Sequence, residues 1–190
     1  NFVQLQHSVC SFSNEESWVI LSPIEQSIKQ KIESVGTPLK DWDIQIYRGV
    51  LTGYNDAFII STEKRDEILA NCKTEEEKSK TAELIRPILR GRDIKRYGYN
   101  WADLWLINTH NGVKDVIPRV DINDFPALKA HLDQHWDKIS KRADKGDTPY
   151  NLRNCAYLED FNKPKITWNR IASIKQFAIV DSGIYIQDSM

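Results

Sequence analysis

The residues with the clearest chemistry in this 190-residue chain are cations crowded into the run Arg90-Gly-Arg-Asp-Ile-Lys-Arg-Tyr97. The four are Arg90, Arg92, Lys95 and Arg96. Arginine carries a rigid, permanently charged fork that bonds two phosphate or guanine acceptors at once. This density of cations predicts contacts to the phosphates of a nucleic acid, with Asp93 orienting one of the arginines. The alternative is a solvated basic segment without a ligand.

A second group of polar side chains lies in the run Arg142-Ala-Asp-Lys-Gly-Asp-Thr-Pro-Tyr-Asn-Leu-Arg-Asn154. Asparagine can pair with the edge of adenine and arginine with that of guanine, while tyrosine can stack on a base or wedge between bases. We therefore expect base contacts from Tyr150, Asn151 and Arg153, and a phosphate contact from Lys145. The alternative is an ordinary surface loop stiffened by proline.

Two further lysines, Lys163 and Lys165, are candidates for phosphate contacts, and Trp168 beside them is expected to pack in the core. The sequence contains no glycine-rich nucleotide loop, no nucleophile elbow and no metal-ligand spacing. His131 and His135 lie one helical turn apart but lack the glutamate of a zinc-protease motif, so we expect structural roles for them. No catalytic residue, metal or cofactor is predicted within the chain.

The composition places the chain among soluble proteins with one sizeable core. Its formal net charge is -1 and 41% of its residues are hydrophobic, so a surface for nucleic acid must be local. Three widely spaced cysteines without a ligand pattern favour a reducing, cytoplasmic location. No apolar run approaches the length of a membrane span, and no membrane partner is expected.

Local signals predict three helices. Ser22-Pro-Ile-Glu25 is a capping box that starts a helix closed by Gly36, and its apolar stripe is expected to pack in the core. That stripe consists of Ile24, Ile28, Ile32 and Val35. A second capping box at Thr74 starts a helix that must end before Pro87, and a third helix is expected from Asp124 to Ile139.

Strand signals complete an α+β fold with a mixed, twisted sheet and flanking helices. Strands are expected over 44–51, 57–61, 104–108, 116–120, 165–168 and 177–180. The turn Thr52-Gly53-Tyr54-Asn55-Asp56 should join the first two strands, because glycine accepts a positive φ there. Asp181-Ser-Gly183 is expected to form a hairpin turn into 184–186.

Several collinear motifs make the sequence resemble the TaqI-like C-terminal specificity domain. This is the target recognition domain of type IIG restriction-modification enzymes and related adenine-specific DNA methyltransferases. The motifs include RGVLTGYNDAFII, IRPILRGRDIKRY, LWLINTHNG, FPALKAHL, RADKGDTPYNLRNCAY and FNKPKITW, and the resemblance covers roughly residues 18 to 188. The family's motifs fall on Thr52, Gly53 and Asn55, on Arg90, Gly91, Arg92 and Asp93, on Arg142, Lys145, Gly146, Tyr150 and Arg153, and on Lys163 and Lys165.

The resemblance implies that residues 22–190 form a DNA target recognition domain, truncated at its C-terminus, and that residues 1–21 link it to an upstream methyltransferase domain. Such a domain positions double-stranded DNA for N6-adenine methylation, and for cleavage, by domains outside the chain. S-adenosylmethionine, and Mg²⁺ for cleavage, are implied for the parent protein alone, because the catalytic and cofactor motifs do not occur here. The alternative is a protein-interaction module of a phage-defence complex that does not read DNA.

Overall fold

The computed structural model describes residues 20–171 and 173–188, and the chain divides into two compact units, Asn1–Ile46 and Tyr47–Met190. The smaller unit contains helix α2 (Pro23–Val35) and the short 3-10 helix η1 (Leu39–Asp41). Most of the linker expected over residues 1–21 lies outside the described residues. The boundary expected at residue 21 falls just before α2, within the smaller unit.

Helix α2 begins and ends where the sequence predicts. The Ser22 hydroxyl accepts from the backbone of Glu25, whose carboxylate accepts in turn from the Ser22 backbone at 2.8 Å, and Gly36 caps the C-terminus. The prediction that its apolar stripe packs in the core is wrong, because Ile28 is 53% and Val35 80% exposed. An amphipathic pattern predicts a helix with an apolar face but does not name what covers that face.

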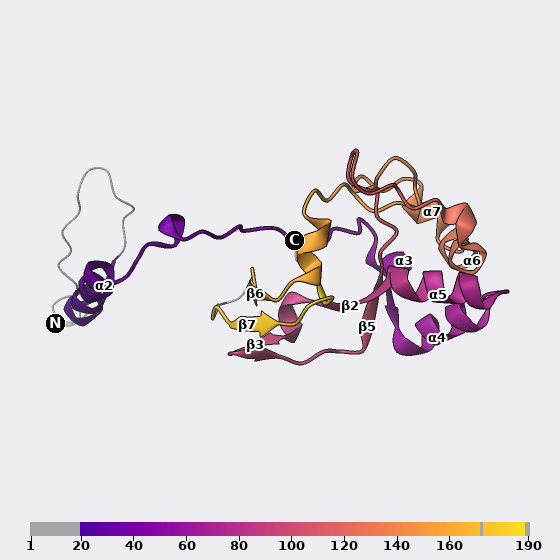
Figure 1. Ribbon diagram of the computed structural model, residues 1–190. Helices are drawn as coiled ribbons and strands as arrows, with labels where there is room; N and C mark the ends of the chain where they lie inside the picture. The colour runs from indigo at the N-terminus through magenta and orange to yellow at the C-terminus, as the bar shows by residue number, and fades with distance from the viewer. Residues whose placement is uncertain (1–19, 172, 189–190) are drawn as a thin grey trace. The chain divides into compact units, whose positions relative to one another are not determined.

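The larger unit is α+β, which confirms the predicted fold class (Figure 1). Its α-helices are α3 (Asn55–Phe58), α4 (Thr62–Ala70), α5 (Glu75–Leu84), α6 (Pro126–Asp133) and α7 (Trp136–Ile139). Its 3-10 helices are η2 (Gly91–Asp93), η3 (Ile122–Asp124) and η4 (Leu158–Asn162). Its strands are β1 (Ile59–Ser61), β2 (Ile85–Leu89), β3 (Ile94–Lys95), β4 (Gly98–Tyr99), β5 (Leu104–Ile107), β6 (Lys165–Trp168), β7 (Phe177–Val180) and β8 (Tyr185–Ile186).

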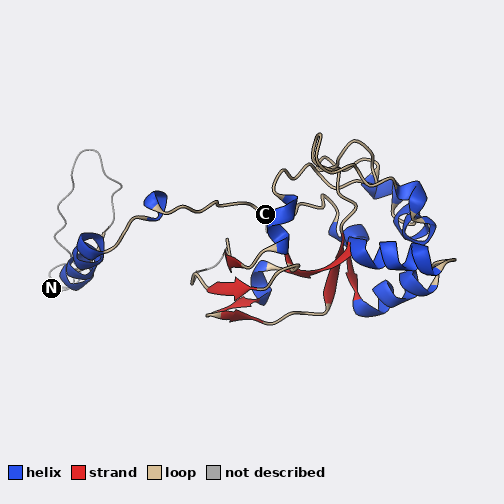
Figure 2. Cartoon of the chain, viewed as in Figure 1, coloured by secondary structure: helices blue, strands red, loops and turns tan. Residues whose placement is uncertain are grey.

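The main sheet has the strand order β1-β5-β2-β8 and is mixed. Strand β5 pairs antiparallel with both β1 and β2, whereas β2 pairs in parallel with β8. Two antiparallel hairpins, β3–β4 and β6–β7, form separate small sheets. In Figures 1 and 2 these hairpins lie at one end of the larger unit and helices α4 to α7 at the other.

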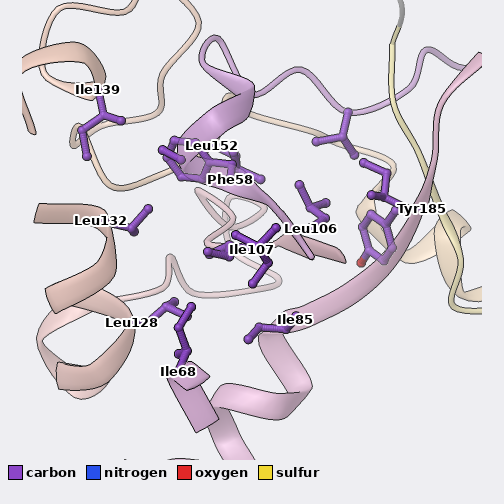
Figure 3. Close-up of a cluster of buried hydrophobic side chains, with 14 of the residues drawn as sticks. Phe58, Ile68, Ile85, Leu106, Ile107, Leu128, Leu132, Ile139, Leu152 and Tyr185 are labelled. Atoms are coloured by element: carbon purple, nitrogen blue, oxygen red, sulfur yellow. The ribbon is translucent and has the colours of Figure 1, made fainter. Parts of the chain in front are cut away.

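The main core lies between the central strands and the helices. Leu128 and Leu132 point from α6 toward Ile107 of β5, and Phe58 of α3 closes the cluster (Figure 3). All four side chains are completely buried. A smaller cluster joins Leu89, Ile94, Ala178 and Val180 under the two hairpins. The hairpins are therefore fixed to the body of the domain by apolar packing.

Four predicted strands differ from the structure. Over 44–51 a single bridge joins Val50 to Gln187, and over 57–61 helix α3 precedes a short β1, so the turn at residue 52 leads into a helix. Residues 116–120 form no strand: a single bridge pairs Ile117 with Val113 across a turn in which Asp115 has a φ of 61°. Strand β8 does not fold back on β7 but pairs with the distant β2. These outcomes depend on long-range pairing, which local patterns do not contain.

The other helix predictions are largely confirmed. Helix α5 is capped by the Thr74 hydroxyl, which accepts from the backbone of Glu77 at 3.0 Å, and it ends at Leu84, before Pro87. The helix expected from 124 to 139 is split, because α6 ends at Asp133 and α7 starts at Trp136. No helix within the described residues is long and apolar enough to cross a membrane.

Candidate nucleic-acid interface

The cations of the first group surround η2 and the β3–β4 hairpin. Arg90 is bonded to Asp93. The Asp93 carboxylate accepts from the backbone N–H of Arg90 at 2.9 Å and from its side-chain Nε at 2.9 Å and Nη2 at 2.8 Å. Burial opposes ionisation of Asp93, but the hydrogen bonds from Arg90 outweigh it and lower the Asp93 pKa. The pair fixes the start of η2, and Gly91 follows it as the first residue of that 3-10 helix.

The remaining three cations of this group face solvent. Arg92, Lys95 and Arg96 are exposed and take part in none of the ion pairs among residues 20–171 and 173–188. Lys95 donates to the carbonyl oxygen of Arg92 at 2.7 Å, and the Arg96 guanidinium lies 5.2 Å from the ring centroid of Tyr97. Their charges are therefore available to an anion. We call Arg92, Lys95, Arg96 and Tyr97 the hairpin group.

The β6–β7 hairpin stands beside the β3–β4 hairpin. Strands β3 and β4 both contact β7, and the backbone N–H of Tyr97 donates to the Phe177 carbonyl at 2.8 Å. Lys165 ties the start of β6 to the end of β7, because its Nζ donates to the carbonyls of Lys163 at 2.9 Å and Asp181 at 3.1 Å. Burial lowers the pKa of Lys165. Lys163 is exposed but paired with Asp160 at 2.7 Å.

The outer face of the β6–β7 hairpin is apolar. The cross-strand pairs Ile166 with Ile179 and Trp168 with Phe177 put four large side chains on this face, all of them exposed. The prediction that Trp168 packs in the core is therefore wrong: it is 40% exposed and contacts Phe177 at 6.1 Å between ring centroids. The strand alternation places Thr167, Ala178 and Val180 inward instead.

The second group of residues lies in the loop 142–154, which is organised by the buried Arg142. Its guanidinium donates to four backbone carbonyls and lies over the ring of Phe58, 4.4 Å from the centroid. The carbonyls belong to Thr52, Asp144, Pro149 and Asn151. Burial lowers the Arg142 pKa to about 10, so the group stays charged at neutral pH without a salt-bridge partner among the described residues.

Asn151 also supports this loop, because it is 1% exposed and both ends of its side-chain amide form hydrogen bonds. Its Nδ2 donates to the Val120 carbonyl at 2.9 Å and the His110 carbonyl at 3.3 Å, and its Oδ1 accepts from Thr148 at 2.6 Å. A base edge would have to displace all of these bonds. In this structure Asn151 therefore supports the backbone of the loop and has no donor free for a base.

Tyr150 and Arg153 differ from Asn151 in being accessible. The Tyr150 hydroxyl donates to Asp133 at 2.6 Å, and burial together with this bond raises the Tyr150 pKa. Arg153 is exposed and pairs with Asp144 at 3.2 Å. Lys145 is exposed and donates to the Ser140 carbonyl at 2.9 Å. These are surface interactions that a ligand can replace at small cost.

The turn at residues 52–55 closes against the same loop. Thr52 is buried and donates to Asn55 Oδ1 at 2.6 Å. Gly53 has a φ of +66°, and a Cβ atom there would lie 2.8 Å from the Asp144 carbonyl oxygen. Only glycine fits both conditions. The turn and the loop therefore form one unit around Arg142, and an open hollow beside it is lined by Lys138 and Lys141.

The two groups lie at different ends of the larger unit. The β3, β6 and β7 strands are at one end in Figure 1, while α7, from which the loop 142–154 departs, is at the other. Among residues 20–171 and 173–188, no hydrogen bond, ion pair or ring contact joins the hairpin group to Tyr150 or Arg153. The structure therefore divides the residues predicted to contact DNA between two surfaces.

Sequence reasoning did not single out Arg142 as the centre of its loop or Tyr97 as an exposed aromatic. A signal existed for each: Arg142 opens the polar run, and Tyr97 stands between Arg96 and Gly98. The described residues contain no cluster of histidine, cysteine or carboxylate side chains suited to a metal. His131 is buried with Nε2 3.0 Å from the Ala57 carbonyl, a structural role. Cys72 and Cys155 are free thiols.

Comparison with known proteins gives one informative similarity. Over 161 residues, 82% of this chain, the sequence is 25% identical to the type II methyltransferase M.BstVI of Geobacillus stearothermophilus. The chain spans about a quarter (26%) of the length of that protein. No family model matches the sequence. The chain is thus similar to a segment of a type II methyltransferase, and it combines an α+β fold with exposed cations on a small hairpin.

Proposed function

We propose that this chain is a sequence-specific recognition domain for double-stranded DNA in a type IIG-like restriction-modification protein. It would position the target for N6-adenine methylation, and for cleavage, by domains outside the chain. The observation that carries the proposal is the hairpin group, whose three exposed cations have no ion-pair partners among the described residues. It occurs in a chain similar to a type II methyltransferase.

The distribution of charge supports a phosphate-binding role for the β3–β4 end. The one carboxylate within the basic run, Asp93, is buried and bonded to Arg90, and it forms no ion pair with the three exposed cations. Acidic side chains gather instead in the first turn of α5, at Glu75, Glu76 and Glu77. Helix α5 and strand β3 lie at opposite ends of the larger unit (Figure 1). The β3–β4 end would therefore attract a polyanion, whereas the first turn of α5 would not.

The loop 142–154 is the proposed base-reading surface. Arg142 and Asn151 hold its backbone, while Tyr150 and Arg153 remain accessible. Functional side chains on a loop need a rigid support of this kind to give a fixed geometry. Arg153 can exchange Asp144 for a guanine edge, and Tyr150 can exchange Asp133 for a base or a phosphate.

The methyl donor implied for such a protein is S-adenosylmethionine. We assign no residue of this chain to it, and the described residues offer no metal cluster for cleavage. The proposed contribution of the chain is binding and orientation of the duplex. Its partners would be double-stranded DNA and a methyltransferase domain of the same protein.

The proposal is tested by the salt dependence of duplex binding. Each phosphate contact lowers the slope of log K against log salt by about 0.9. Replacing Arg92, Lys95 and Arg96 together by glutamine should therefore make the slope shallower by about 3. The matched control replaces Lys78 and Lys80 of α5, two exposed lysines each already paired with a glutamate. Duplex binding that does not respond to salt, or that the control weakens equally, would overturn the proposal.

Arg153 allows a separate test of base reading. Arg153→Ala should change which duplexes are enriched from a random pool, because a bidentate arginine discriminates against a wrong base by about 1–3 kcal/mol. Lys163→Ala should weaken all duplexes to the same extent, because a phosphate contact carries no sequence information. The opposite pattern would reverse the assignment of these residues to bases and phosphates.

A second candidate function is a protein-interaction module of a phage-defence complex. It is favoured by the exposed apolar face of Ile166, Trp168, Phe177 and Ile179, because contiguous exposed apolar side chains mark interaction sites. This function predicts a stable complex with a protein partner that survives replacement of the hairpin cations but not Trp168→Ser. The absence of such a complex, together with salt-dependent duplex binding, would leave DNA recognition as the function.

A further inference from the structure

The β3–β4 hairpin presents an aromatic side chain at its tip. Its strands pair Ile94 with Tyr99 and Lys95 with Gly98, so Arg96 and Tyr97 form the turn. Tyr97 is 80% exposed and has a φ of +66°, a region that bulky L-residues rarely adopt. A residue kept in such a conformation without burial is a candidate for function rather than for packing.

The conformation of this tip is fixed from beneath. The backbone N–H of Tyr97 donates to the Phe177 carbonyl at 2.8 Å, which fastens the turn to β7. Ile94 at the base of the hairpin is completely buried with Leu89 and Val180. The Tyr97 ring itself belongs to neither core cluster. The fold thus holds the backbone of this residue and leaves its ring in solvent.

Tyr99 of the same hairpin provides the internal contrast. It packs against the smaller core cluster, and its hydroxyl donates to Asp181 at 3.1 Å. Tyr97 has no such role, and its neighbour across the ring is the Arg96 guanidinium. Lys95 is exposed on the same hairpin, and Arg92 is exposed in η2 just before it. An aromatic ring flanked by cations suits a nucleic acid, because the ring can stack on a base face while the cations bind phosphates.

We propose that Tyr97 is a wedge that stacks on a base face at one step of the bound duplex while Arg92, Lys95 and Arg96 hold the flanking phosphates. The inference rests on the proposed DNA-binding function and adds a local unstacking of the duplex to it. Side chains inserted between base steps unstack them and bend the helix. Tyr97 would thereby fix the position of the domain along the duplex.

The substitution Tyr97→Gly isolates the ring from the fold. Glycine accepts the positive φ without strain, so this variant should be at least as stable as the wild type. Its duplex affinity should fall about tenfold, within the range measured for loss of one stacking ring. Tyr97→Phe keeps the ring and should bind like the wild type. Equal affinity of all three proteins would overturn the inference.

The direct readout is the fluorescence of 2-aminopurine, which rises when a base loses its stacking neighbour. Duplexes are first selected from a random pool for binding to the full 190-residue chain. A series of the selected duplex is then made in which 2-aminopurine replaces one base at a time along the site, and each is mixed with the protein. We expect emission to rise at one step with the wild type and Tyr97→Phe, but not with Tyr97→Gly. Duplex binding with no rise, or a rise that Tyr97→Gly retains, would refute the wedge and leave the proposed function intact. If no duplex is enriched or bound, the proposed function fails and the wedge with it.

Discussion

Replacement of Arg142 should destabilise the domain through the loop that it organises. Its guanidinium is the donor to four backbone carbonyls, and two of these bonds, to Thr52 and Asn151, are buried. The Asn151 carbonyl keeps a second donor, the N–H of Gly146 at 2.9 Å. Arg142→Met would therefore leave the Thr52 carbonyl as the main buried acceptor without a partner.

The expected magnitude follows from these contacts. An unpaired buried carbonyl costs about 1–3 kcal/mol. The part-buried bonds to Asp144 and Pro149 contribute less, up to about 1 kcal/mol between them. Removing the buried charge returns some of its desolvation energy. We expect Arg142→Met to lower the free energy of unfolding by about 2–4 kcal/mol. Arg142→Lys should lose about half as much, because an ammonium has three donors but no planar fork.

Urea unfolding measures this loss, and hydrogen exchange locates it. The amide of Leu152 donates to the Thr109 carbonyl at 2.8 Å and that of Gly146 to Asn151. In Arg142→Met both should exchange faster by a larger factor than the amides of β5, which report the global loss of stability. Lys141→Met is the matched control, an exposed neighbour expected to stay within about 0.5 kcal/mol of the wild type. If Arg142→Met is as stable as this control, the role of Arg142 as the centre of the loop is refuted.

Three further predictions follow from the same contacts. Asp93→Asn should lower the free energy of unfolding by about 2–3 kcal/mol, because it leaves Arg90 half-buried without its carboxylate; an unchanged urea midpoint would contradict this. Burial lowers the pKa of His131, so the unfolded chain binds the proton first and stability should fall as pH drops below about 6.5. His131→Gln should flatten that slope in thermal unfolding, and a pH-independent wild type would contradict the reasoning. Gly146→Ala should destabilise the loop, because its Cβ would lie 2.6 Å from the backbone carbonyl oxygen of Leu152 and would also meet the Asn111 side chain; normal exchange of the loop amides would argue against it.

Local signals predicted the helix starts and some of the strands correctly. The capping residues Ser22 and Thr74 define the starts of α2 and α5, since an N-cap needs only neighbours three residues away. The apolar run from Phe177 to Val180 likewise indicated the strand that the structure shows as β7. The predicted hairpin after Asp181 is wrong because β8 pairs with β2, almost a hundred residues earlier in the chain. Pairing over such a distance leaves no mark on the short segment itself.

The candidate site was predictable in its residue types but not in its accessibility. Arg92, Lys95 and Arg96 are exposed, yet Arg90 in the same run is bonded to Asp93. Asn151 has the side chain of a base reader, but carbonyls from His110 and Val120 take its donors. Whether an amide faces solvent or the backbone is decided by segments that the fold brings to it. A motif therefore identifies the loop, and the structure identifies the side chains that are free within it.

The central proposal is that this chain selects the DNA sequence for a methyltransferase. The most direct measurement maps methylated adenines across the genome of cells that express the full-length protein, with the wild-type sequence, Arg153→Ala or the α5 control Lys80→Gln. We predict methylation at one defined motif that Arg153→Ala shifts or abolishes at unchanged protein level, and that Lys80→Gln leaves as it is. A methylation pattern that is the same in all three would contradict the account.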